Sequence, residues 1–172
     1  NGLPLIGHSI ASAKASQLVD RVIVSTDDEA IRHVANDLGA ETPFLRPSEL
    51  SDDKAGMWGV IDHAFSWLKD SGDVCDVIVL LQPTSPIRTA GVIDKALNVF
   101  KSSKCNSLVS VSEVPHQFTP DSLLKIEQDY LVNAVESKKI YRRQDKSRFF
   151  ARNGPSILIT RRMTIERGDM YG

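Results

Sequence analysis

The segment Gln82-Pro83-Thr84-Ser85-Pro86-Ile87-Arg88 places polar side chains directly after a continuous apolar run that starts at Val77. Two prolines restrict its backbone and so fix the positions of the neighbouring side chains. Gln82 can donate to and accept from a sugar hydroxyl or an amide, and Arg88 can pair with a carboxylate or a phosphate. A strand-to-helix turn capped by Thr or Ser is the alternative interpretation. The spacing alone leaves both readings open.

Other basic residues could also bind anions. Arg46 follows an apolar pair and precedes Pro47, so we expect it to emerge from a strand end, where it either contacts an anion or a base edge or lies on the surface. A basic cluster with Asp145 as its only acid comprises Lys138, Lys139, Arg142, Arg143, Lys146, Arg148 and Arg152. Its arginines favour two-point contacts with phosphate or carboxylate. A solvated surface, a dimer contact and RNA binding are the alternatives.

Histidine does not complete a familiar catalytic arrangement. His63 falls within a helical pattern and is expected to be structural. His116 follows a strand end beside Pro115, where a structural role and a place in the ligand cleft both stay open. No Ser-His-Asp order, metal-ligating histidine pair, glycine-rich phosphate loop or pair of catalytic carboxylates can be assembled. The residues by themselves therefore assign no catalytic group.

Strand and helix patterns alternate along the chain. Runs rich in β-branched residues predict strands at about 21–25, 77–82, 107–112 and 156–160, with a further short strand near 41–44. Apolar residues at helical spacing predict helices after Pro4, after Asp28, from Met57 to Leu68 and from Ala90 to Phe100. This order predicts a doubly wound α/β domain with a mainly parallel sheet, in which ligands bind beyond the carboxyl ends of the strands.

The alternation stops at about residue 113 and resumes after about residue 151. We interpret 113–151 as an inserted segment that leaves the sheet and re-enters it. Its apolar residues are too many for a small excursion to bury by itself: Phe118, Leu123, Leu124, Tyr130 and Leu131. The pattern predicts that this segment packs against a second copy of the chain.

Composition excludes several classes of protein. The 172 residues carry 21 Lys and Arg against 22 Asp and Glu, so the formal net charge of −1 does not favour nucleic acid or an anionic membrane as a partner. No apolar run approaches the length of a membrane span, no signal peptide opens the chain, and two cysteines without metal-ligand spacing suit a reducing cytoplasm. The chain opens without Met, and we expect residues to be missing at both ends.

Six motifs in collinear order resemble one family. They are Asn1-Gly2-x-Pro4-Leu5-Ile6, Val24-Ser25-Thr26-Asp27-Asp28, Leu45-Arg46-Pro47-x-Glu49-Leu50, Leu81-Gln82-Pro83-Thr84-Ser85-Pro86-x-Arg88, Arg142-Arg143-Gln144-Asp145 and Arg152-Asn153-Gly154. Together they resemble the CMP-sialic acid synthetases (acylneuraminate cytidylyltransferases) over essentially the whole chain.

The resemblance implies a Rossmann-like fold, a homodimer built partly by the inserted segment, and dependence on Mg²⁺. The implied partners are CTP and an acidic nine-carbon sugar. The sugar's anomeric hydroxyl would attack the α-phosphorus of CTP and release pyrophosphate, with catalysis mainly by positioning and charge neutralisation. Chain 1–172 would then be a single nucleotidyltransferase domain, incomplete at both ends.

The same resemblance assigns roles to individual residues. Arg46 matches the contact on the cytidine side. The sugar would be bound by Gln82, Arg143, Gln144 and Asn153. The family's triphosphate-binding loop is expected before Asn1 and its Asp-x-Asp metal site after Gly172, so no metal ligand is assigned within the chain.

Two loops depart from the neuraminic-acid pattern. Residues 53–57 and 114–118 resemble the bacterial enzymes for legionaminic acid and related nonulosonic sugars, so neuraminic acid itself is not the expected substrate. The alternatives are a cytidylyltransferase for another acidic sugar, such as 3-deoxy-manno-octulosonate, and a non-catalytic nucleotide-binding module.

Overall fold

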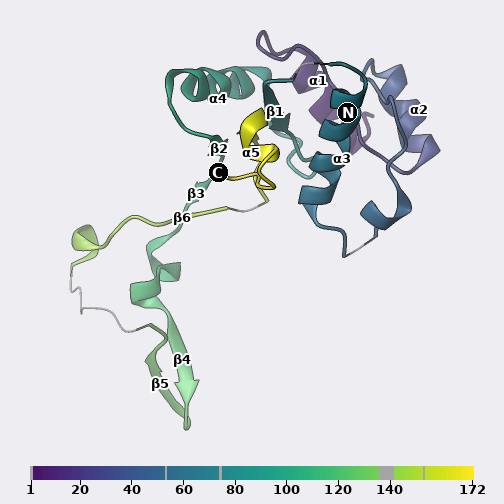
Figure 1. Cartoon of the computed structure of the whole chain (residues 1–172). Helices are drawn as coiled ribbons and strands as arrows, with labels where there is room; N and C mark the ends of the chain where they lie inside the picture. The colour runs from purple at the N-terminus through teal and green to yellow at the C-terminus, as the bar shows by residue number, and fades with distance from the viewer. Residues whose placement is uncertain (1, 53, 74, 136–141, 153) are drawn as a thin grey trace. The chain divides into compact units, whose positions relative to one another are not determined.

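The computed structural model describes residues 2–52, 54–73, 75–135, 142–152 and 154–172 (Figure 1). The chain divides into two compact units, which are described one at a time. The first unit joins residues 1–109 to residues 155–172, and the second comprises residues 110–154. The second unit covers the range for which the sequence predicts an insertion, while its role in dimerisation stays a prediction.

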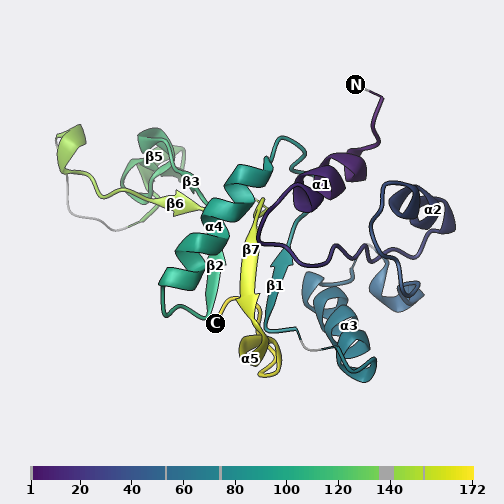
Figure 2. The ribbon, with the colours of Figure 1, turned by 90° about the horizontal axis from the view of Figure 1, so that it is seen from above.

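A three-stranded sheet forms the centre of the first unit, and its strand order is β1 (Val77–Leu80), β7 (Leu158–Arg161), β2 (Ser107–Val109) (Figure 2). β7 runs antiparallel to both neighbours, with Ile159 opposite Val79 of β1 and Leu108 of β2. The predicted α/β class is confirmed. The expectation of a mainly parallel sheet is corrected for β7, whose two ladders are antiparallel.

The direction of β7 follows from the path of the chain. Val109, the last residue of β2, pairs with Leu158, the first residue of β7, so the chain returns to the sheet beside the point where it left. A parallel neighbour would need a crossover to the opposite end of the sheet. An apolar run such as 156–160 predicts a strand buried on both faces, but it carries no information on direction.

The predicted strand at 21–25 is reduced to a single parallel bridge between Ile23 and Glu41. Val24 N–H donates to the Glu41 carbonyl and Glu41 N–H donates to the Val22 carbonyl, both at 2.8 Å. The local direction of the chain therefore agrees with the prediction, but the regular pairing is shorter than the apolar run suggested.

Helix α4 (Ala90–Ser102) covers one face of the sheet. Its fully buried Phe100 belongs to a cluster with Ile159 of β7, against which Val77 and Val79 of β1 also pack. Burying a side chain of this kind stabilises the fold by roughly 1.5–3 kcal/mol. The helical spacing of apolar residues from Ala90 to Phe100 is thus explained by contact with the sheet.

Helix α3 (Met57–Asp70) covers the opposite face. Its Phe65 belongs to a second cluster, against which Ile78 and Leu80 of β1 pack. Successive side chains of a strand point to opposite faces, so β1 supplies one pair of residues to each helix. This arrangement explains why the sequence of β1 is continuously apolar.

The remaining elements of the first unit precede the sheet or follow it. They are α1 (Leu5–Lys14), α2 (Glu29–Asp37), the 3-10 turn η1 (Ser48–Leu50) and α5 (Arg162–Ile165). Helix α2 begins where the Asp28 carboxylate accepts from Ile31 N–H at 2.9 Å, and it ends before Gly39, whose φ of 78° suits glycine. Both ends of α2 lie where the sequence predicts them.

The second unit contains two short ladders. β3 (Ser112–Glu113) pairs with β6 (Phe150–Ala151), and β4 (Leu124–Glu127) pairs with β5 (Tyr130–Asn133), both antiparallel. Between β4 and β5, Gln128 and Asp129 adopt left-handed φ values of 47° and 66°, as a tight hairpin turn requires. The unit also contains the 3-10 turns η2 (His116–Phe118), η3 (Pro120–Ser122) and η4 (Arg143–Asp145).

Arg88 joins three segments of the first unit. Its guanidinium donates from Nη1 to the Ser156 carbonyl at 2.6 Å and, more weakly, to the Gln82 carbonyl at 3.5 Å. Nη2 donates to Ser9 Oγ in α1 at 3.0 Å, and the Arg88 carbonyl accepts from Ser12 Oγ at 2.6 Å. Arg88 is only 6% exposed, so it acts as a buried tie between α1, the end of β1 and the start of β7.

We expect Arg88→Ala to lower the free energy of unfolding by about 3 kcal/mol. The substitution removes buried volume and leaves the Ser156 carbonyl and the Ser9 hydroxyl without their donor, at about 1–3 kcal/mol for each group left unsatisfied. Urea unfolding followed by the fluorescence of Trp58 and Trp67 measures the change. Lys95→Ala on the exposed side of α4 is the matched control. A loss below 1 kcal/mol for Arg88→Ala would contradict the structural role.

Candidate functional site

The loop after β1 is fixed by hydrogen bonds to the Gln82 carbonyl. Ser85 N–H donates to the Gln82 carbonyl at 3.2 Å, which closes a turn, and Arg88 donates to the same carbonyl. No described residue hydrogen-bonds to the side-chain amide of Gln82, which is half-buried. Helix α4 begins without a side-chain cap from Thr89, so capping of this helix does not explain the polar residues of the loop. The arrangement leaves the Gln82 amide available to a ligand.

Arg88 does not have the ligand contact that its sequence position suggested. Its two terminal nitrogens donate to protein carbonyls and a hydroxyl, its Nε is buried without a described partner, and burial lowers the pKa of its guanidinium below the ordinary value. The physical reason is the turn closed by the hydrogen bond from Ser85 N–H to the Gln82 carbonyl. After this turn the Arg88 side chain is buried and donates to the same carbonyl. Arg88 therefore supports the loop and does not form its binding surface.

Arg46 lies in a second loop, which follows the bridge between Glu41 and Ile23 and runs beside Thr26. Its backbone N–H donates to the Thr26 carbonyl at 2.8 Å, and its side chain reaches Asp27 Oδ1 from Nη2 at 3.2 Å and Ser51 Oγ from Nε at 3.0 Å. The Arg46 side chain is 22% exposed, so it is more than a freely solvated surface residue. The structure thus shows an Arg46 side chain held by protein groups, and its contact with an anion or a base stays a prediction.

Asp27 is the partner that the sequence analysis missed. Thr26, Asp27 and Asp28 all precede α2 and could each cap it, yet only the Asp28 side chain does so. Asp27 is consequently available to Arg46, and hydrogen bonds from its own backbone and from Arg46 lower the pKa of its carboxyl. The presence of two adjacent acids where one cap suffices was the signal that could have identified this pair.

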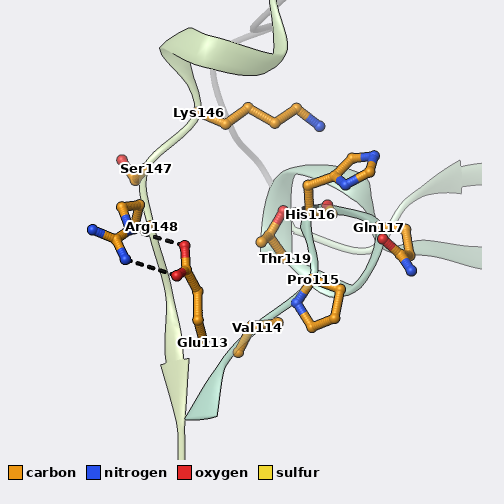
Figure 3. Close-up of a pocket in the computed structure, with 9 residues that line it drawn as sticks. All are labelled: Glu113, Val114, Pro115, His116, Gln117, Thr119, Lys146, Ser147 and Arg148. Atoms are coloured by element: carbon orange, nitrogen blue, oxygen red, sulfur yellow. Dashed lines mark hydrogen bonds and ion pairs between the residues drawn. The ribbon is translucent and has the colours of Figure 1, made fainter.

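The second unit contains a cavity of about 470 Å³. Figure 3 shows Lys146 reaching from the segment before β6 toward the turn that carries His116. His116 lines this cavity, and its place in a ligand cleft stays a prediction. The lining residues are Glu113, Val114, Pro115, His116, Gln117, Thr119, Lys146, Ser147 and Arg148.

The two cations of this cavity have different surroundings. Arg148 donates to both carboxylate oxygens of Glu113 at 2.8 and 2.7 Å and lies over the Phe150 ring, so its charge is compensated. The Arg148 contact lowers the pKa of the Glu113 carboxyl. Lys146 Nζ instead donates to a neutral group, Ser122 Oγ, at 2.7 Å, and no described carboxylate pairs with it. Lys146 therefore gives the cavity its unbalanced positive charge.

The predicted sugar-binding residues are distributed over both units. Gln82 belongs to the first, together with Arg46. Gln144 belongs to the second, where it lies exposed in η4. The side chain of Arg143 and the whole of Asn153 lie outside what the structure describes, so these two predictions remain untested. The structure therefore describes these binding residues as separate groups within the two units.

Two further features, a membrane-spanning helix and a cluster of metal ligands, are absent from the described residues. No helix in these ranges is long and apolar enough to cross a membrane. No three His, Cys, Asp or Glu side chains within them come together in a way that could hold a metal ion. The Mg²⁺ implied by the sequence resemblance stays a prediction.

Comparison with known proteins identifies similar sequences. The N-acylneuraminate cytidylyltransferase of Streptococcus agalactiae serotype V is 33% identical over 97% of this chain, which corresponds to 39% of that protein. The CMP-N,N'-diacetyllegionaminic acid synthase of Legionella pneumophila is 32% identical over 99% of this chain and 72% of its own length. The pseudaminic acid cytidylyltransferase of Campylobacter jejuni is 34% identical over 65% of this chain and 48% of its own length.

A solved structure has the same fold. A CMP:2-keto-3-deoxy-manno-octonic acid synthetase complexed with CTP superposes with a TM-score of 0.68 over 96% of this chain and 66% of that chain, at 16% identity. This likeness supports the Rossmann-like α/β assignment and is too distant in sequence to indicate the substrate. The chain spans less than half the length of the S. agalactiae and C. jejuni relatives.

The family profile described as cytidylyltransferase matches residues 1–167, which include both strand-end loops and the second unit. With a match over nearly the whole sequence, and with relatives about one third identical, this chain belongs to the cytidylyltransferase family.

Proposed function

We propose that the chain belongs to an enzyme that transfers CMP from CTP to the anomeric hydroxyl of a sialic-acid-like nonulosonic acid. The hydroxyl oxygen forms a bond to the α-phosphorus, the bond from that phosphorus to the bridging oxygen breaks, and pyrophosphate leaves. The family match over residues 1–167 is the observation that carries this proposal. The hydroxyl proton is lost in the same step, and none of the described residues is assigned as its acceptor.

Arg46 is proposed as the nucleotide contact and Gln82 as a sugar contact. The support is that Gln82 lies in the loop after β1, and Arg46 in the loop after the isolated bridge between Ile23 and Glu41, since α/β folds bind their ligands beyond such ends. Arg46 is held by Asp27 and Ser51, and the Gln82 amide has no described protein partner. Such preformed groups can position two reactants without forming a covalent intermediate.

The second unit is proposed to recognise the acidic part of the sugar. Arg143 and Gln144 in η4 shortly precede Lys146, whose ammonium group gives the neighbouring cavity its unbalanced charge. A carboxylate is the group that such a cation would attract. Asn153 is proposed as a further sugar contact on the basis of its motif alone.

A nonulosonic acid of the legionaminic type is the proposed substrate. The loops at 53–57 and 114–118 support it, and so does the alignment with the L. pneumophila relative, which covers nearly three quarters of that protein. Mg²⁺ and a cytoplasmic location are proposed on the resemblance and composition described above. No step is assigned to the metal, because the described residues supply no ligand set for it.

A homodimer is also proposed, with β4 and β5 as its contact. Leu124, Ile126 and Leu131 share one face of this hairpin, because Ile126 lies opposite Leu131 in the ladder. Their exposed fractions are 55%, 74% and 69%. A two-stranded hairpin is marginally stable by itself, and an apolar face of this kind is stabilised when a second copy covers it.

Incubating the protein with CTP, Mg²⁺ and a panel of nonulosonic acids tests the reaction. We expect pyrophosphate release with N,N'-diacetyllegionaminic acid to exceed that with N-acetylneuraminic acid or 3-deoxy-manno-octulosonate. Release with 3-deoxy-manno-octulosonate alone would reassign the sugar. Binding of CTP without release from any acid would instead identify a nucleotide-binding module and contradict the proposed reaction.

Arg143→Lys is expected to raise the sugar KM or lower kcat at least tenfold, about 1.4 kcal/mol, with little change in the KM for CTP. Lysine keeps the charge but loses the two-point geometry with which arginine binds a carboxylate. Arg142→Lys, at the neighbouring position, is the control. Sugar kinetics like those of the unsubstituted protein in Arg143→Lys would show that this arginine serves the surface or the dimer.

Leu131→Asp is expected to convert the dimer to a monomer at micromolar concentration, because it places a charge in the apolar face. Sedimentation velocity measures the association state, and circular dichroism checks that the fold is retained. Lys125→Asp lies on the other face of the hairpin and is the matched control. A monomeric unsubstituted protein, or a Leu131→Asp variant that still dimerises, would remove this face from the contact.

A further inference from the structure

Arg46 is anchored along one complete edge of its guanidinium. Nε and Nη2 form the edge with which arginine grips a carboxylate or phosphate at two points. Here Nε donates to Ser51 Oγ at 3.0 Å and Nη2 donates to Asp27 Oδ1 at 3.2 Å. The protein itself thus occupies the donors of this edge, and only the Nη1 side of the guanidinium is left to a ligand.

Both anchors are fixed by their own surroundings. The Ser51 hydroxyl donates to the Pro47 carbonyl at 3.0 Å, so its oxygen lone pairs face Arg46. Asp27 follows Thr26, which is 4% exposed and whose hydroxyl accepts from Asp28 N–H at 3.2 Å. Asp28 alone caps α2, so the Asp27 carboxylate is not drawn into the helix terminus.

This geometry limits what Arg46 can offer to a nucleotide. No described residue hydrogen-bonds to Nη1, so its N–H groups are the free donors that point away from both anchors. The carboxylate of Asp27 compensates the guanidinium charge, which weakens attraction for a phosphate and leaves the directional hydrogen bonds intact. A neutral acceptor, such as a base oxygen or nitrogen, fits a charge-compensated donor better than a triphosphate does.

We propose that Asp27 and Ser51 are positioning residues, which hold the Arg46 guanidinium so that Nη1 meets a neutral acceptor on the cytosine base. This inference rests on the proposed function, because it takes Arg46 as the nucleotide contact. It adds two residues to which the comparisons assign no role. In this arrangement Arg46 contacts the base, and it does so through Nη1.

Asp27→Ala and Ser51→Ala test the positioning in steady-state kinetics. Each is expected to raise the KM for CTP about three- to tenfold, with kcat and the sugar KM unchanged, because loosening one guanidinium misplaces one binding contact. In an Arg46→Ala background, the same substitutions are expected to add less than about twofold, since the group they position is gone. Full additivity in that background would overturn the inference.

Glu29→Gln is the matched control. Glu29 is an exposed acid that pairs with a different arginine, Arg32, two positions from Asp27. We expect it to leave the kinetics for CTP unchanged and the melting temperature of all four variants to stay within a few degrees. An equal rise of the CTP KM in Glu29→Gln would show that Asp27 acts only through the general charge of this loop, which overturns the inference.

Calorimetric titration with cytidine, CMP and CTP separates a base contact from a phosphate contact. For a base contact, Asp27→Ala weakens all three ligands by the same factor, and the factor does not depend on salt. A phosphate contact predicts a loss that grows with the number of phosphates and falls as salt screens it, and that result would overturn the proposal.

The same titrations distinguish failure of the inference from failure of the proposed function. If Arg46→Ala weakens cytidine but Asp27→Ala and Ser51→Ala do not, the positioning role is wrong and the nucleotide contact stands. If Arg46→Ala binds cytidine as the unsubstituted protein does, the assignment of Arg46 itself fails, and the positioning role fails with it. Pyrophosphate release from CTP reports on the reaction independently of both.

Discussion

The buried guanidinium of Arg88 is the interaction on which the geometry of the sheet edge depends. It satisfies the Ser156 carbonyl and the Ser9 hydroxyl, and so ties the start of β7 to α1 beneath the loop that carries Gln82. Burial lowers its pKa, but arginine begins from so high a value that the group stays charged at neutral pH. Burying a cation is costly unless it is hydrogen-bonded. The bonds from Arg88 to the Ser156 carbonyl, the Gln82 carbonyl and the Ser9 hydroxyl offset this cost, and they hold the three segments in place relative to one another.

The other arginines of the two loops and the cavity are largely compensated by acids. Arg46 faces Asp27 and Arg148 faces Glu113, so neither presents a bare charge. Lys146 in the second unit differs, because its described partner is a hydroxyl. Of these three cations, Lys146 alone therefore has no carboxylate partner among the described residues.

The four long helices could be predicted because their signals are local. Asp28 and Gly39 delimit α2, and the apolar spacing of α3 and α4 matches the faces they bury. The direction of β7 could not be predicted, because an apolar run looks the same whether its strand runs parallel or antiparallel to its neighbours. The loop positions of Arg46 and Gln82 could also be predicted, because prolines and polar residues follow an apolar run at each of them. The Arg46–Asp27 pair could not be predicted, since it joins residues 19 positions apart and leaves no periodic signal. The role of Arg88 was missed for a related reason, since a polar residue in a binding loop and one buried beneath it look alike in sequence.

The adjacency of Val109 and Leu158 in the sheet has a consequence for the evolution of this architecture. Because β2 and β7 pair antiparallel at these two residues, the residues between Val109 and Leu158 form the connection of one long hairpin. The entropy of closing a loop grows only with the logarithm of its length, so doubling the excursion costs about 0.6 kcal/mol. Residues 110–154 can therefore lengthen, shorten or exchange side chains while the strand register stays the same. Such a chain can change the length and the side chains of this unit without rebuilding the three-stranded framework from which it departs.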